Sequence, residues 1–147
     1  MIPLTQINYT ANGNVSPCRF ITPVTGSDTG GQLAIQAADA TQLIIGVSYE
    51  ATRYPPNSAS DDGYVAIAGE MLMYHCAGMV CNLKLGGTVQ PNDVLTANSD
   101  GTGTGIKLDY TSDSVQCAAA LAIQGGVSGD FVEVYVLSPF FHRTVHA

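Results

Sequence analysis

Three histidines and four cysteines are the side chains of this sequence best suited to metal binding or nucleophilic catalysis. His75, Cys76 and Cys81 lie close together, but adjacent residues of a strand point to opposite faces and no second pair of ligands follows. His75 with Cys81 or Cys117 is the Cys/His pairing left to consider, and a catalytic base also needs an orienting group. We therefore predict a packed or surface histidine, no metal site and no cofactor.

The acidic and glycine-rich motifs indicate turns more than chemistry. Asp61 and Asp62 precede a glycine, and Asp93 follows Pro-Asn, which is typical of carboxylates that cap turns. The spacing of a calcium loop is absent. The segment GTGTG at Gly101–Gly105 lacks the Lys-Ser/Thr ending of a phosphate loop, so we interpret it as a mobile loop tip. The sequence predicts no catalytic residues and a protein that is not an enzyme.

The charge balance argues against polyanionic partners. The chain has 12 acidic and 5 basic residues, a formal net charge of -7, and only 12% charged residues. The basic residues are scattered singly, which predicts neither direct nucleic-acid binding nor binding to an anionic membrane. They are Arg19, Arg53, Lys84, Lys107 and Arg143. So little charge fits a surface that a partner covers, or a plain neutral β-domain.

The sequence predicts neither a signal peptide nor a membrane-spanning segment. The N-terminus is polar, with no apolar core of signal-peptide length, and no apolar run approaches a membrane span. We expect synthesis in a cytoplasm, with reduced cysteines and no disulfides.

The periodicity predicts an all-β protein. Short apolar runs rich in β-branched and aromatic residues alternate with Gly, Asp, Asn, Ser and Pro clusters, and 147 residues suit one domain. Thr52–Ser60, with two prolines, is expected to be an exposed loop. The predicted strands are Arg19–Val24, Gln32–Ala37, Ile44–Glu50, Tyr64–Ala68, Met71–Cys76, Asp93–Ala97, Ile106–Tyr110, Ala118–Ile123 and Phe131–Leu137.

The two ends of the chain differ from the middle. Residues 1–18 are predicted to form an extended arm, 19–138 a small β-barrel or sandwich, and 139–147 a tail. A frayed tail is the other interpretation of the N-terminus. Apolar residues at both ends are candidates for contact with a capsid or a neighbouring subunit, because they are costly to leave exposed. They are Ile2, Leu4, Ile7, Tyr9, Phe140 and Phe141.

Several segments in order resemble the capsid decoration (cement) proteins of tailed bacteriophages. They are AADATQLIIGV at Ala37–Val47, GYVAIA at Gly63–Ala68, VQPNDVLTANSDG at Val89–Gly101, and the paired segments within Ala120–Leu137. Asn92 departs from the family pattern, which has Gly before the Asp, but Asn tolerates the positive φ that such a turn needs.

The resemblance implies a small β-barrel or β-tulip-like domain that binds the outside of an assembled capsid. Such proteins often form trimers and stabilise the shell by bridging major capsid subunits. The implied location is therefore the exterior of the virion after synthesis in the host cytoplasm, and the implied mechanism is burial of apolar area.

Other functions remain open on the sequence. Another phage structural module, such as a head-fibre base or a tail protein, would share the all-β pattern. A small glycan-binding β-domain is a further alternative, although the chain has no Trp to stack on a sugar.

Overall fold

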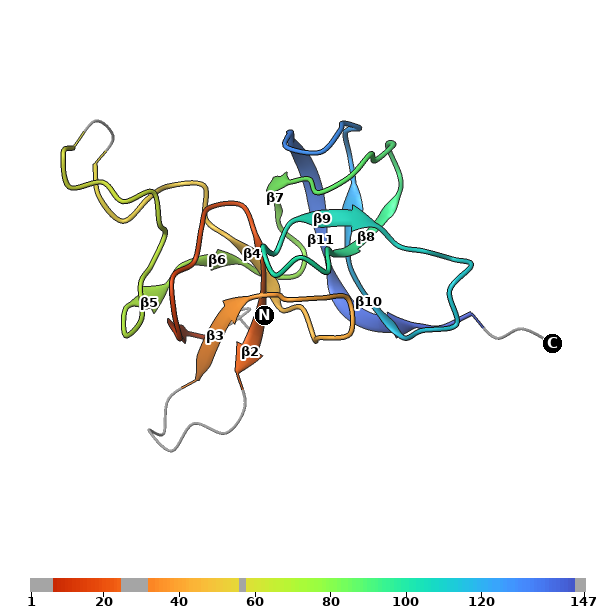
Figure 1. Cartoon of the computed structure of the whole chain (residues 1–147), viewed down its shortest axis with the longest axis horizontal. Coiled ribbons are helices and arrows are strands. Elements are labelled where there is room, and N and C mark those ends of the chain that lie inside the picture. Colours follow the sequence, from red (N-terminus) through yellow and green to blue (C-terminus); the bar gives the residue numbers. More distant parts are fainter. Residues whose placement is uncertain (1–6, 25–31, 56–57, 145–147) are drawn as a thin grey trace, which may run out of the picture.

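The computed structural model describes residues 7–24, 32–55 and 58–144, and it confirms the predicted all-β class. Eleven strands form two sheets, and no helix occurs among the described residues. Figure 1 shows the sheets side by side, with the N-terminal half of the chain in one and the C-terminal half in the other. No helix in the described part of the chain could span a membrane.

The first sheet has six short strands in the order β5-β1-β3-β2-β4-β6. β1 runs parallel to β3, and the other pairs are antiparallel. The strands are β1 (Tyr9–Ala11), β2 (Phe20–Val24), β3 (Leu33–Gln36), β4 (Gly46–Ser48), β5 (Met71–Leu72) and β6 (Tyr74–His75).

The second sheet has five strands in the order β7-β11-β10-β8-β9 and nearly closes into a barrel. A parallel bridge joins Leu85, after the edge strand β7, to Gly105 of the opposite edge strand β9. Gly86 N also donates to Gly105 O at 2.8 Å. The strands are β7 (Val80–Lys84), β8 (Val94–Ala97), β9 (Gly105–Lys107), β10 (Gln116–Ala122) and β11 (Phe131–His142).

Each sheet has its own core, and the barrel core also takes side chains from the first sheet. Leu83, Leu95 and Val134 are buried inside the barrel because inward residues alternate with outward ones along each strand. Phe20 and Val47 of the first sheet belong to the same cluster. A second cluster lies in the first sheet and includes Tyr9, Ala11, Val15, Ile21 and Leu72.

The GTGTG segment is the joint between the sheets, so our interpretation of it as a mobile loop tip was wrong. Gly103, Thr104 and Gly105 are buried. Gly103 adopts φ 71°, and its carbonyl accepts a 2.7 Å hydrogen bond from Phe20 N. A Cβ on Gly103 would lie 2.7 Å from the backbone oxygen of Phe20, so glycine at this position allows the two sheets to approach closely.

The predicted strands largely match those observed, with three differences. The predicted strand Met71–Cys76 is divided into β5 and β6, which lie at opposite edges of the first sheet. Tyr64–Ala68 is not a strand: only Ala66 forms a bridge, with Val15. Val80–Lys84 is a strand that we did not predict, because its pairing with β11 is distant in sequence. The predicted turn at Asn92 is confirmed, with φ 72°.

Both terminal boundaries differ from those expected. Tyr9–Ala11 is not part of an arm, because it pairs with β3 and β5 and its side chains enter the core of the first sheet. At the other end, β11 continues to His142, since Phe140–His142 pairs with Gln116–Ala118.

Candidate functional site

His75 packs at the boundary between the two sheets. In the described part of the chain, its side chain contacts Glu50 and Tyr49, and it forms no hydrogen bond with a cysteine. Its Nε2 lies 3.2 Å from Glu50 Oε2, and its ring stacks on Tyr49 at 4.5 Å between centroids. Nδ1 is buried and has no hydrogen-bond partner among the described residues. Glu50 Oε1 accepts from Asn82 N of β7 at 3.2 Å. The pair therefore connects the first sheet to the barrel, and it lacks a nucleophile.

The carboxyl group of Glu50 is held in its charged form by this arrangement. Burial opposes ionisation, but the hydrogen bonds from Asn82 N and His75 outweigh it, so the pKa of Glu50 falls below its ordinary value of 4.5.

Three of the four cysteines are buried, and burial keeps their thiols in the protonated form. All four are free, and Cys18, Cys81 and Cys117 are buried. Burial, with a smaller contribution from Glu50, raises the pKa of Cys18 to about 11 and that of Cys81 to about 12. These thiols are protonated near neutral pH, and a protonated thiol is a poor nucleophile and metal ligand. Within the described ranges, no three His, Cys, Asp or Glu side chains cluster as metal ligands would.

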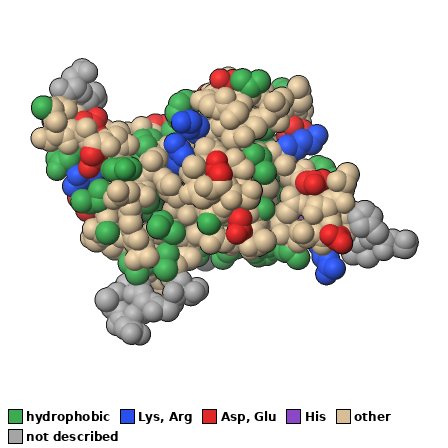
Figure 2. All heavy atoms as spheres, in the orientation of Figure 1, with side chains coloured by type: hydrophobic (Ala, Val, Ile, Leu, Met, Phe, Trp, Pro, Cys, Tyr) green, Lys and Arg blue, Asp and Glu red, His purple; other side chains and the backbone are tan. Residues whose placement is uncertain are grey.

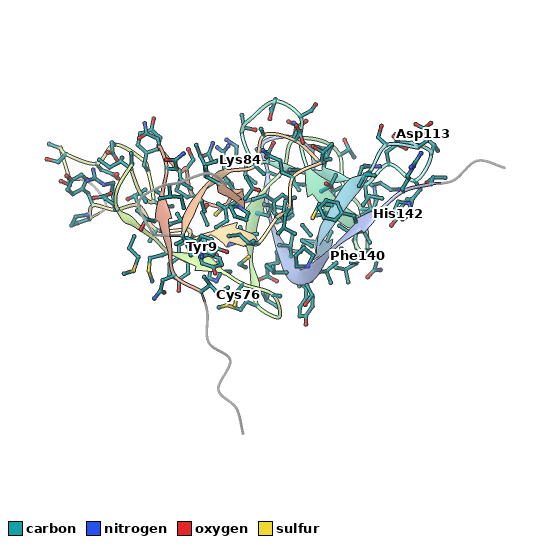
Figure 3. All side chains as sticks on the ribbon, turned by 90° about the horizontal axis from the view of Figure 1, so that it is seen from below. Tyr9, Cys76, Lys84, Asp113, Phe140 and His142 are labelled. Atoms are coloured by element: carbon teal, nitrogen blue, oxygen red, sulfur yellow. The ribbon has the colours of Figure 1, made fainter. Side chains whose placement is uncertain are left out.

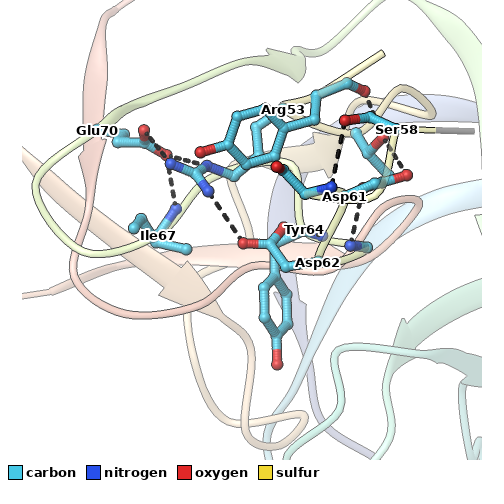
Figure 4. A network of polar contacts seen from close by, with 11 residues as sticks. Arg53, Ser58, Asp61, Asp62, Tyr64, Ile67 and Glu70 are labelled. Carbon is cyan, nitrogen blue, oxygen red and sulfur yellow. Dashed lines mark hydrogen bonds and ion pairs between the residues drawn. The ribbon is translucent and has the colours of Figure 1, made fainter. Parts of the chain in front are cut away.

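The loop predicted at Thr52–Ser60 projects from the first sheet and is organised by an arginine (Figure 4). Arg53 Nε and Nη2 donate to the two carboxylate oxygens of Glu70 at 2.7 and 2.8 Å, and Nη1 donates to Asp62 at 3.0 Å. The guanidinium also lies over the Tyr54 ring at 4.5 Å. The network holds the loop against the β5 end of the sheet, and Arg53 offsets one of the two carboxylate charges, which leaves one net negative charge.

An apolar surface along β11 is the strongest candidate for contact with a partner. The residues Val132, Val134 and Val136 point inward, while Phe131 and Tyr135 point outward and are exposed. We define the β11 apolar surface as Val80, Phe131, Tyr135, Phe140 and Phe141, all of them exposed. Val80 is paired with Tyr135 across the β7–β11 ladder, so it extends the surface onto β7.

Part of this surface could have been found from the sequence. Both Phe140 and Phe141 were candidates, and the structure exposes 53% and 49% of them. Val80, Phe131 and Tyr135 were missed. The signal was that FVEVYVL at 131–137 is apolar at outward as well as inward positions, apart from Glu133.

The C-terminal half of β11 also presents an unpaired edge. β7 accompanies β11 only as far as Val136, whose backbone bonds to Gly78 and Met79. Further on, β10 pairs with one side of β11, and the described residues place no strand on the other side. Pro139 lies in this stretch, as expected for an edge strand. Figure 3 shows Phe140 and His142 along this half of β11. An exposed edge beside two aromatic rings is a typical place for another chain to bind.

The four N-terminal residues that were candidates for contact with a partner differ in their surroundings. Ile2 and Leu4 lie outside the described residues. Ile7 is 58% exposed, whereas Tyr9 is 8% exposed and packs edge-to-face on Tyr74 at 5.7 Å. The Tyr74 hydroxyl donates to Ile7 O at 2.6 Å. Tyr9 therefore contributes to the core of its own chain, and contact of these residues with a partner stays a prediction.

The comparisons with known proteins give one informative structural neighbour. No protein-family model and no curated protein matches the chain. The structure is similar to the crystal structure of the head fibre gp8.5 N base of bacteriophage phi29, with a TM-score of 0.54 and 20% sequence identity. The alignment covers 96% of this chain and 97% of that chain, so the two share their fold over nearly their whole length.

Proposed function

We propose that this chain is a non-enzymatic structural protein of a bacteriophage virion that binds the outside of the capsid. The observation that carries the proposal is the neighbour itself, because a base module of a phage head fibre has this fold over 96% of the chain. The segments that resemble those of capsid decoration proteins, and that occur in the same order along the chain, support the same class of protein.

The β11 apolar surface supplies a physical mechanism for attachment. Aromatic side chains at the centre of an interface contribute most of its binding energy. Burying Phe140 and Phe141 against major capsid subunits would stabilise the shell by about 25 cal/mol for each Å² of apolar area, before ordering costs. Many copies, each one bridging subunits as a homotrimer, would add their contributions.

The neighbour supports a second form of the proposal to the same degree. In that form the chain is the base of a head fibre, and its contact with the capsid anchors a longer appendage. Cryo-EM of the virion distinguishes the two, because a fibre base would carry density that continues outward from it.

The direct test is sedimentation with purified, expanded capsids of the phage that encodes the chain. We expect the wild type to co-sediment and the Phe140→Ser/Phe141→Ser variant to bind about thirtyfold more weakly, as loss of aromatic hot spots predicts. Val127→Ser is the matched control, because Val127 is also exposed but lies outside the β11 apolar surface. Light scattering should show a trimer, in solution or on the particle.

Two results would contradict the proposal. One is a mature virion that carries no copies of the chain. The other is a wild-type protein that stays free of capsids yet binds glycans on an array, which would favour the glycan-binding alternative.

A further inference from the structure

A polar groove lies at the joint between the sheets and contains two cations, neither of which has a carboxylate within 4.0 Å among the described residues. It has a volume of about 320 Å³ and is lined by Arg19, Lys84, Asn98, Asp100, Thr102 and Ser128, among others. It draws these residues from the position just before β2, from β7 and the segment after it, and from the turns around 98–104 and 128–129, so separate elements converge on it. The hollow at Lys107–Thr111 is different, because one continuous segment lines it.

Arg19 is the more deeply placed cation. Its Nη1 donates to Thr102 O at 2.8 Å, and its Nε is buried with no partner in the described part of the chain. Burial lowers the pKa of its guanidinium, and the nearby negative charge of Asp100 opposes this effect only in part. A half-buried cation with an unpartnered Nε gains from an added anion.

Lys84 is the second cation of the groove. Its Nζ lies 5.8 Å from the centroid of the exposed Phe131 ring. In contrast, Arg53 and Lys107 each have a carboxylate within 4.0 Å, and no such ion pair occurs for Arg19 or Lys84 in the described ranges. Figure 2 shows basic side chains gathered in the middle of the visible face, with an acidic group beside them.

The charges of the groove select one class of anion. Among the described residues that line it, Arg19 and Lys84 are positive and Asp100 is negative, which leaves one net positive charge. A single carboxylate balances that charge, whereas a phosphate dianion would exceed it and be repelled by Asp100. The amide and hydroxyl groups of Asn98, Thr102 and Ser128 suit hydroxyl or amide groups next to the carboxylate.

We propose that this groove binds a monoanionic carboxylate on a polar ligand, with Arg19 and Lys84 as the groups that bind it. The inference is independent of the proposed attachment to a capsid, since the β11 apolar surface does not supply the cations. The carboxylate can come from an acidic sugar or from an acidic side chain of a peptide, and the test below separates these sources.

The test is a titration of the ¹⁵N-labelled full chain followed by NMR, with glucuronate, N-acetyl-aspartate amide, glucose and inorganic phosphate as probes. We expect one of the two carboxylates to give saturable shifts of the amides of Gly86, Thr102 and Gly129 in the millimolar range. The carboxylate that binds more tightly identifies the source. The titration is run at about pH 8, where phosphate is mainly the dianion. Glucose and phosphate should then bind at least about tenfold more weakly, because glucose has no charge and the dianion exceeds the charge of the groove.

Two variants should change the affinity for the carboxylate in opposite directions, which a purely structural role of these residues would not produce. Lys84→Gln should weaken carboxylate binding by about tenfold, the loss expected for one charge-assisted contact. Asp100→Asn removes the opposing charge and should tighten it several-fold. Lys107→Gln is the matched control, because that lysine lies outside the groove and should leave binding unchanged.

The proposal is overturned by any of three results. The first is that neither carboxylate gives saturable shifts in the groove, and the second is that phosphate or glucose binds as well as they do. The third is that Lys84→Gln binds like the wild type while its spectrum shows a folded protein. None of these results would affect co-sedimentation with capsids, so the two proposals can fail separately.

Discussion

The longest strand of the barrel, β11, has twelve residues, whereas in the described part of the first sheet no strand is longer than the five of β2. The barrel closes on a dense core that is made mostly of its own side chains, with Phe20 and Val47 added from the first sheet. The first sheet combines a smaller core with turns, an arginine network and side chains inserted into the barrel. The barrel should therefore be the more independent part, and the first sheet should depend on it through the joint at Phe20.

Phe20 is the position where this dependence can be broken most strongly. Its ring is fully buried in the barrel core although its backbone belongs to the first sheet. We expect Phe20→Ala to lower the free energy of unfolding by about 3–5 kcal/mol, because it leaves a cavity between the sheets. Chemical denaturation measures the loss.

The matched control for Phe20 is Phe140→Ala, which removes the same ring from an exposed position. Its effect should stay within about 0.5 kcal/mol. Equal effects of the two variants would show that the ring at the joint does not couple the sheets.

Two glycines of the GTGTG segment test how close the sheets must lie. Gly103 and Gly101 have similar φ values of 71° and 79°, but a Cβ would meet Phe20 O at 2.7 Å only at Gly103, and nothing within 4 Å at Gly101. Gly101→Ala should cost about 1 kcal/mol of stability through its backbone conformation alone. Gly103→Ala should cost more, and thermal unfolding of both variants gives the difference. Equal losses would mean that the joint tolerates a wider separation.

The joint also shows where sequence reasoning ends. Alternating apolar residues at Val132, Val134 and Val136 predicted a half-buried strand, because that pattern depends only on neighbouring positions. The glycines of GTGTG have the same composition in an exposed tip and in a buried crossing. Only the position of Phe20, more than eighty residues away in the chain, decides between the two. Alternation of Gly with Thr at every second position was a weak local signal of close backbone approach.

Of the two candidate surfaces, one could be predicted from the sequence and the other could not. The exposed rings of Phe140 and Phe141 could be proposed from the sequence, since two adjacent phenylalanines near the end of the given sequence are unusual. The groove could not, because Arg19, Lys84 and Asp100 come from three separate segments and are each ordinary surface residues in the sequence. Tyr9 was assigned to an arm because a three-residue strand is too short to show a period.

A smaller loss of stability is expected when Glu50, which connects the first sheet to β7, is replaced. Its folded pKa is lowered, so its charged form stabilises the fold above its ordinary pKa of 4.5, and this contribution is lost as the pH falls through the folded pKa. Glu50→Gln should therefore be less stable than the wild type at neutral pH, and the two should converge in acid. Thermal unfolding across this pH range tests it, with Glu133→Gln, an exposed glutamate, as the control. A constant difference at every pH would assign the loss to packing.

The smallest effect should come from the arginine network of the projecting loop, and it should stay local. Arg53→Gln removes the paired hydrogen bonds to Glu70 and the ion pair with Asp62. These groups are near the surface, so salt should weaken them in the wild type as well. Hydrogen exchange should speed up at Ile67 and Tyr64, whose amides bond to Glu70 and Asp62, while β10 and β11 keep their protection. Arg143→Gln, at an exposed arginine, should change neither region. Faster exchange in the barrel of the Arg53 variant would contradict the comparison, because it would make the barrel depend on the loop.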